Sequence, residues 1–179
     1  MEIVAVIVVV LIVLVIWYIA VANGIKVAEL KVQEGESGID VALTKRYDVL
    51  TKMLDTVKGY QKHEKAVLTE IVKLRSGMTM AEKNNANRAM DALSKEINIL
   101  AESYPELRSN TNFTELQKAI VDVEEHLQAA RRLYNANVNA YNRRIVVFPN
   151  SIVANNMHAV KKDFFEAEET KRQDVKMEF

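Results

Sequence analysis

Cysteine is absent from this chain of 179 residues, and proline and glycine are scarce, with two and five residues respectively. The absence of cysteine excludes disulfide bonds, thiolate catalysis and zinc sites built on cysteine. Because proline and glycine interrupt helices, their scarcity favours long helices. A net charge is also lacking, since 24 basic and 24 acidic side chains balance. Without a basic excess, we expect no nucleic-acid partner.

Signatures of catalysis are missing as well. The sequence contains no phosphate-binding loop, dinucleotide-binding glycine motif, zinc-protease motif or nucleophile elbow. The histidines lie on separate segments, without the Glu-x-x-His pairs of di-iron bundles, and we expect them at the surface: His63, His126 and His158. Asp40, Asp48 and Asp55 share one helix side, which fits a solvated face better than a cation site. We therefore expect no enzyme, cofactor or metal.

One segment carries no charge at all, the apolar run from Ile3 to Ala22. A helix of this length is about 30 Å long, which matches the hydrocarbon core of a bilayer. Trp17 and Tyr18 stand near its end, where aromatic rings favour the headgroup region. We therefore expect residues 1–22 to be a transmembrane anchor in contact with membrane lipid. A cleaved signal peptide is the alternative, but the run is too long and no basic segment precedes it.

The charges beside this run predict its orientation. Only Glu2 and the terminal amine precede it, whereas Lys26 and Lys31 follow it, with Lys45 and Arg46 further along. Positive charges favour the cytoplasmic side of a membrane. We therefore expect a single-pass protein with its N-terminus outside and the remaining chain in the cytoplasm.

Residues 23–38 form a juxtamembrane stretch that contains three of the five glycines. Each glycine costs a helix about 1 kcal/mol relative to alanine. The stretch is therefore either a hinge or a weak place in one long helix. Beyond it, apolar residues recur at helical spacing over 39–76 and about 81–103, and a shorter amphipathic stretch runs from Ile152 through Met157, Val160 and Phe164.

The longest helical pattern lies between these segments, from Phe113 to Phe148, and we expect Thr111 or Asn112 to cap its start. Short connections favour antiparallel packing of neighbouring helices. The predicted fold is therefore all-α, with a transmembrane helix followed by an antiparallel three- to four-helix bundle over residues 39–179.

Four side chains of this long helix are candidates for contacts between helices or in assembly: Tyr134, Asn137, Tyr141 and Asn142. Asparagine is unfavourable inside helices, so hydrogen bonds that fix the helix register would explain its use here. A wet helix face beside the tyrosines explains the pattern equally well.

Several separate motifs resemble the LemA family. They are IDVALTKRYDVLTKMLDTVKGYQKHEKAVL over 39–68, YPELRSNTNFTELQ over 104–117, RRLYNANVNAYN and FPNSIVA within 131–154, FFEAEE over 164–169, and the terminal VKMEF. The resemblance implies a bacterial inner-membrane protein with an N-terminal anchor and an antiparallel helical bundle. It implies a link to membrane organisation, known also from magnetosome-forming bacteria, and supplies no enzymatic activity, cofactor or catalytic residue. Glu36 and Thr51-Lys52 depart from the family's usual Trp and Pro-Asn, which lets the first helix run straight through.

These observations predict a membrane-anchored, non-enzymatic scaffold that self-assembles as a homo-oligomer at the bacterial inner membrane. The alternative is a regulatory adaptor that recruits a membrane-protein partner, such as a membrane protease or a phosphatase-like protein. Basic doublets at 131–132, 143–144 and 161–162 are too few for nucleic acid but suit anionic lipid if they lie near the membrane.

Overall fold

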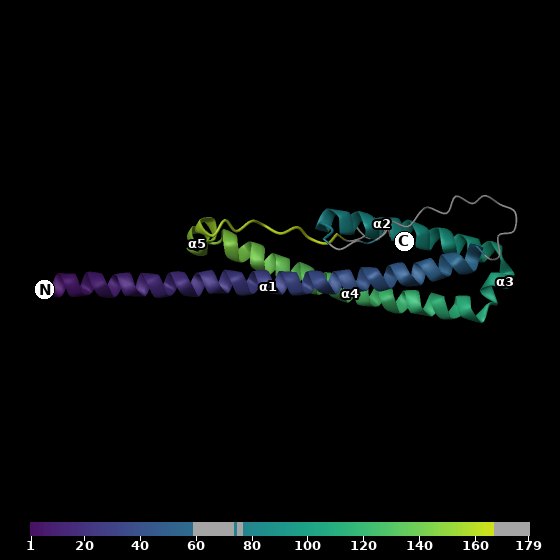
Figure 1. Cartoon of the computed structure of the whole chain (residues 1–179), viewed down its shortest axis with the longest axis horizontal. Coiled ribbons are helices and arrows are strands. Elements are labelled where there is room, and N and C mark those ends of the chain that lie inside the picture. The colour runs from purple at the N-terminus through teal and green to yellow at the C-terminus, as the bar shows by residue number, and fades with distance from the viewer. Residues whose placement is uncertain (59–73, 75–76, 167–179) are drawn as a thin grey trace, which may run out of the picture. The chain divides into compact units, whose positions relative to one another are not determined.

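The computed structural model describes residues 1–58, 74 and 77–166, and every regular element in this part of the chain is a helix (Figure 1). The helices are α1 (Glu2–Lys58), α2 (Met80–Ser103), α3 (Pro105–Arg108), α4 (Thr111–Val146) and α5 (Asn150–Asn156). The predicted all-α class is confirmed. The expected end of the first helical pattern at 75–76, His63 and the terminal VKMEF lie outside the described residues. Contacts divide the chain into unit 1, residues 1–37 and 133–164, and unit 2, residues 38–132 and from 165 on.

Helix α1 extends over 57 residues, Glu2–Lys58, so the juxtamembrane stretch has helical backbone. A stripe of buried positions runs through this stretch to the end of the helix, with successive positions three, four or seven residues apart. Burial of this stripe explains why the helix continues through the glycines. The stripe comprises Ile25, Val32, Gly35, Ile39, Leu43, Arg46, Leu50, Met53 and Val57. A Cβ on Gly35 would lie 3.0 Å from Cα of Tyr134 in α4. This glycine therefore permits a close approach of two helices.

Unit 1 combines the first part of α1 with the end of α4, α5 and the chain that follows it. The two long helices run antiparallel here, because Lys31 contacts Asn137 while Gly24, earlier in α1, lies against Arg144, later in α4. The amphipathic stretch predicted from Ile152 is helical only to Asn156, and residues 157–166 have no regular structure.

Unit 2 combines the later part of α1 with α2, α3 and the beginning of α4. Helices α1 and α2 run in the same direction, since Asp40 pairs with Lys83 and Arg46 with Asp91. Helix α4 runs against α1 in this unit as well. The antiparallel prediction thus holds for α1 with α4 and fails for α1 with α2. The core of the unit is apolar and includes Leu43, Leu50, Ala86, Met90, Leu93, Ile97, Leu107, Phe113 and Phe165.

The ends of α2 follow local signals. The helix was expected at about 81–103 and begins one residue earlier, at Met80. The Thr79 hydroxyl accepts the Glu82 N–H, and the Glu82 carboxylate accepts the Thr79 N–H, which completes a capping box. At the other end, Pro105 begins the short helix α3 after the non-helical Tyr104.

The ends of α4 differ from expectation at both sides. The side chain of Asn110, rather than of Thr111 or Asn112, caps the helix by accepting the Phe113 N–H at 3.1 Å. The helix ends at Val146, because the residue before Pro149 is disfavoured in helical conformation. Phe148 therefore lies beyond the helix and is 75% exposed, not part of its buried stripe.

Two of the three glycines in the juxtamembrane stretch, Gly35 and Gly38, provide a paired test of this packing. Gly35→Ala should lower the free energy of unfolding by about 1–3 kcal/mol, because the new methyl group must displace the main chain of α4. Gly38→Ala should raise it by about 1 kcal/mol through helix propensity, since its Cβ would meet only the Ala130 methyl at 3.9 Å. Denaturant unfolding followed by circular dichroism measures both. Equal stabilisation by the two substitutions would contradict the close approach at Gly35.

Candidate functional site

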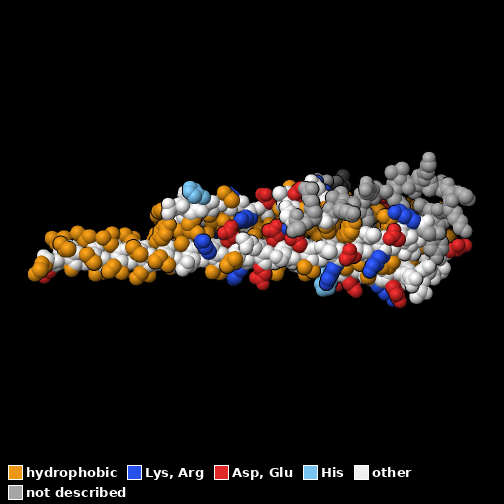
Figure 2. Space-filling view, in the orientation of Figure 1, with side chains coloured by type: hydrophobic (Ala, Val, Ile, Leu, Met, Phe, Trp, Pro, Cys, Tyr) orange, Lys and Arg blue, Asp and Glu red, His pale blue; other side chains and the backbone are white. Residues whose placement is uncertain are grey.

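The N-terminal part of α1 is apolar and exposed on every side. Figure 2 shows apolar side chains along the face of this part that is turned towards the viewer. From Ile3 to Ile16 its large side chains are about half exposed or more. Within the described residues, α1 is the one helix long and apolar enough to cross a bilayer, and no residue of its most apolar 18-residue window is buried. Such a surface is unfavourable in water, at about 25 cal/mol per Å² of apolar area. The run is therefore compatible with a membrane anchor.

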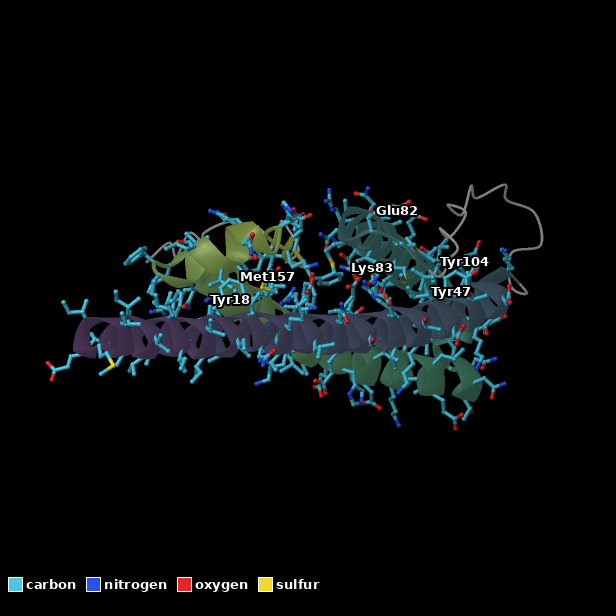
Figure 3. The ribbon with its side chains drawn as sticks, turned by 60° about the vertical axis from the view of Figure 1, so that its left-hand side comes forward. Tyr18, Tyr47, Glu82, Lys83, Tyr104 and Met157 are labelled. Atoms are coloured by element: carbon cyan, nitrogen blue, oxygen red, sulfur yellow. The ribbon has the colours of Figure 1, made fainter. Side chains whose placement is uncertain are left out.

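The end of the run is where unit 1 begins to cover α1. Trp17 and Ala22 are half-buried, and the Tyr18 hydroxyl accepts a hydrogen bond from Asn156 Nδ2 at 2.6 Å. Figure 3 shows Met157, the residue after α5, beside this part of α1. Helix α5 is thus fixed against the last turn of the apolar run.

The predicted contact residues of α4 all lie in unit 1 and contact their own chain there. Asn137 Nδ2 donates to the Lys31 carbonyl oxygen of α1 at 2.8 Å, which is a hydrogen bond between helices. Asn142 contacts the main chain of Lys162 twice, with Nδ2 donating at 2.9 Å and Oδ1 accepting at 2.8 Å.

The two tyrosines hold the same returning segment. The Tyr134 hydroxyl donates to the Asp163 carbonyl oxygen at 2.7 Å. The Tyr141 ring is buried and has Lys162 Nζ 5.9 Å from its centroid, and this ammonium also pairs with Glu29 of α1 at 3.0 Å. Tyr134, Tyr141 and Asn142 form a cluster that holds residues 162–163 against α4. We call this cluster the α4 clamp.

Burial changes the acidity of both tyrosines in the α4 clamp. Burial raises the pKa of Tyr134 to about 12, and the carboxylates of Glu36 and Asp163 add to the rise. Burial likewise raises the pKa of Tyr141, with Glu29 adding to the rise and Lys162 opposing it. Both phenols are therefore neutral donors at physiological pH rather than acids or bases poised for proton transfer.

A charged cluster lies at the centre of unit 2. Arg46 is 2% exposed, and its guanidinium lies 2.5 Å from carboxylate oxygens of Asp91 in α2 and Glu124 in α4. It also donates to the side-chain oxygen of Asn87 at 2.6 Å. The Arg46 Nε atom is buried without a hydrogen-bond partner among the described residues. One guanidinium therefore connects three helices of the unit.

This cluster was not predicted, although the sequence carries a signal for it. Arg46 follows Leu43 by three residues and precedes Leu50 by four, which is the spacing of the buried stripe of α1. A charge at a core position needs a partner from another helix, because an unpaired buried ion is costly. The position of Arg46 on the stripe therefore indicates a buried ion pair.

An open surface hollow of about 590 Å³ lies along α4 and is lined by Asp122, Glu125, His126, Gln128, Ala129 and Arg132. A cavity of about 20 Å³ beside Asp91, Glu124 and Phe165 has room for about one water and not for a substrate. No group of three metal-ligating side chains occurs in residues 1–58, 74 and 77–166. The aspartates and histidines singled out in the sequence are exposed where they are described, and Asp40 among them pairs with Lys83: Asp40, Asp48, Asp55, His126 and His158.

These features define an all-helical protein with one candidate N-terminal membrane helix. The LemA family model matches residues 35–179, which is most of the chain, and the chain therefore belongs to the LemA family. It is similar to Protein LemA of Metamycoplasma hominis, with 26% identity over 163 residues that cover 88% of this chain and 74% of that protein.

The α4 clamp predicts a loss of stability at alkaline pH. Because the folded pKa of Tyr134 lies above the ordinary value of 10.0, its stabilising contribution is present below pH 10 and is lost as the pH rises towards 12. Between pH 10 and 12, the free energy of unfolding should therefore fall less for Tyr134→Phe than for the unsubstituted chain. Unfolding measured across this range tests the expectation, with Tyr47→Phe in unit 2 as the control. Parallel pH profiles for the chain and Tyr134→Phe would contradict it.

The Arg46 cluster predicts a large effect of one substitution. Arg46→Ala should lower the free energy of unfolding by about 2–5 kcal/mol, because it removes a large buried side chain from between three helices and leaves the partly exposed carboxylates of Asp91 and Glu124 without their cation. Arg88→Ala is the matched control. Its ion pair with Glu166 is exposed at both ends, so we expect a loss of about 0–1 kcal/mol. Similar losses in denaturant unfolding would show that the buried cluster does not stabilise unit 2.

Proposed function

We propose that this chain is a membrane-anchored, non-enzymatic scaffold that self-assembles through its helices at the bacterial inner membrane. The observation that carries the proposal is the bare apolar run of α1, Ile3–Ala22, which continues without a linker into packed helices. Lipid is the environment that accepts an apolar helix with no polar face. Membership of the LemA family is consistent with this role and supplies no activity.

The proposed orientation places the N-terminus outside and the packed helices in the cytoplasm. Lys26 and Lys31 follow the apolar run in α1. Unit 1 adds Arg143, Arg144 and Lys161, which are exposed and come from segments fixed beside α1. This basic surplus next to the span supports the cytoplasmic side.

Self-assembly requires a surface other than the α4 clamp. Tyr134 and Tyr141 are buried within their own unit, and Asn137 and Asn142 hydrogen-bond to their own chain. We assign the contact between copies to apolar side chains that unit 2 leaves exposed: Val41, Ile99 and Val121.

Charges inside the apolar run test the anchor. Replacement of Val10 and Leu11 by arginine should release the chain from membranes, because each arginine costs about 2.5–3.5 kcal/mol at the centre of a span. The same replacement of Val27 and Leu30, which are equally exposed but lie beyond the run, should leave membrane association unchanged. Flotation of membranes on a density gradient measures both. Flotation of the first variant with the membranes would contradict the anchor.

The mass of the purified particle tests assembly. In mild detergent we expect a mass that is a multiple of the 20.3 kDa chain, after correction for bound detergent. Ile99→Glu and Val121→Glu should shift it towards a single chain with helicity retained. A single chain at all concentrations would contradict self-assembly, and co-purification with a different membrane protein would favour the adaptor alternative.

A further inference from the structure

The corner between α4 and α5 exposes a continuous set of apolar side chains in unit 1. They are Val146, Val147, Phe148 and Ile152, each about half to three-quarters exposed. The opposite side of α5 is buried, with Val153 and Ala154 inside the unit. The corner is therefore fixed by one face while its other face offers apolar side chains to the surroundings.

The corner is placed beside the apolar run by contacts within unit 1. Asn156, at the end of α5, donates its side-chain hydrogen bond to Tyr18, and the Arg144 guanidinium lies directly over Gly24. Tyr18 precedes the end of the run at Ala22 by four residues, or about 6 Å of helix. If the run lies in lipid, α5 lies at the depth where its last turn meets the headgroups. Figure 2 shows apolar side chains on the segment beside the run as well as on the run itself.

The charges around the corner are of one sign. Between Arg143 and Lys162 the sequence contains no acidic residue. Exposed Arg143, Arg144 and Lys161 flank the apolar corner on both sides in sequence. An apolar face bordered by basic side chains is typical of elements that lie in a membrane interface, embedded by about 5–10 Å. Each basic side chain near an anionic surface contributes about 1 kcal/mol to such binding.

We propose that the α4–α5 corner, residues 146–152, is a second membrane-contacting element that enters the interface of the cytoplasmic leaflet beside α1, with its basic neighbours on anionic lipid headgroups. The proposal rests on the proposed anchor, because α5 is fixed to the helix that the anchor places in lipid. In this position the acyl chains of the lipid cover the exposed apolar side chains of the corner. It also gives unit 1 two points of attachment to one bilayer surface.

Lipid is favoured over a protein occupant by the position of the corner. The hydrogen bond from Asn156 to Tyr18 sets the end of α5 at the depth of the last turns of the apolar run, whose preceding residues are bare. A second copy of the chain or a different protein at this face would have to occupy the headgroup region. These occupants are distinguished by the experiment.

The chain has no cysteine, so single cysteines can carry an environment-sensitive fluorophore without removal of native thiols. Full-length Phe148→Cys and Ile152→Cys are labelled and reconstituted in vesicles of phosphatidylcholine and phosphatidylglycerol. We expect blue-shifted emission and several-fold stronger quenching by lipid-attached spin labels than by aqueous iodide. Val10→Cys, within the run, is the lipid control, and Glu34→Cys, exposed on α1 beyond it, is the water control. Circular dichroism confirms that each labelled chain keeps its helicity.

The outcomes separate the corner from the anchor. Lipid quenching at positions 148, 152 and 10 supports both membrane contact by the corner and the anchor. Lipid quenching at position 10 alone overturns membrane contact by the corner and still supports the anchor. Quenching at 148 and 152 without quenching at 10 supports lipid contact by the corner and refutes the anchor. Protection at 148 and 152 from iodide that disappears on dilution into excess lipid would mean that a second copy covers the corner, and would overturn the proposal. Protection without lipid quenching at any dilution would assign the corner to protein contacts and would overturn it too.

Discussion

Helix α1 has to satisfy two environments along one unbroken length, and the rest of the structure depends on this constraint. Over Ile3–Ala22 it is apolar on every side and stays largely bare, whereas from Ile25 it presents one stripe that other helices bury. The first part is compatible with a lipid environment because little in the described chain covers it, and the second part needs partner helices because its stripe is apolar. The end of α5 is hydrogen-bonded to Tyr18, close to the point where the bare surface of α1 gives way to the buried stripe.

Much of the fold followed from local patterns. The all-α class, the extent of α2 and the existence of the long helix α4 could be predicted, although both ends of α4 differ from expectation, because helical spacing of apolar residues is a local property. The predicted cap of α4 was wrong because Asn110, Thr111 and Asn112 are all competent caps, and backbone geometry selects among them. The parallel course of α1 and α2 could not be predicted either. Helical periodicity predicts which face of a helix is buried. It does not predict whether two packed helices run in the same or in opposite directions.

The asparagines of α4 left two interpretations open, hydrogen bonds that fix the helix register or a wet helix face. In the structure Asn137 and Asn142 hydrogen-bond to main-chain groups of their own chain. Their partners are main-chain groups of Lys31 and Lys162, which every residue type carries, so no sequence signal identifies them. Arg46 is the converse case. Its place on an apolar stripe indicates burial, but the acids that pair with it come from distant helices whose register the sequence leaves open.

In the proposed arrangement, α1 passes from lipid into packed helices without a break. Electron paramagnetic resonance can follow this passage in the full-length chain in vesicles, with nitroxides attached at successive positions from 3 to 39 and with oxygen and a water-soluble nickel complex as relaxation agents. We expect uniform oxygen access and nickel exclusion in the middle of the run. From residue 25 on, we expect access that falls every three to four residues, with minima at 25, 32, 35 and 39. Nickel access throughout residues 3–22, or loss of the helical period across 23–38, would contradict this arrangement.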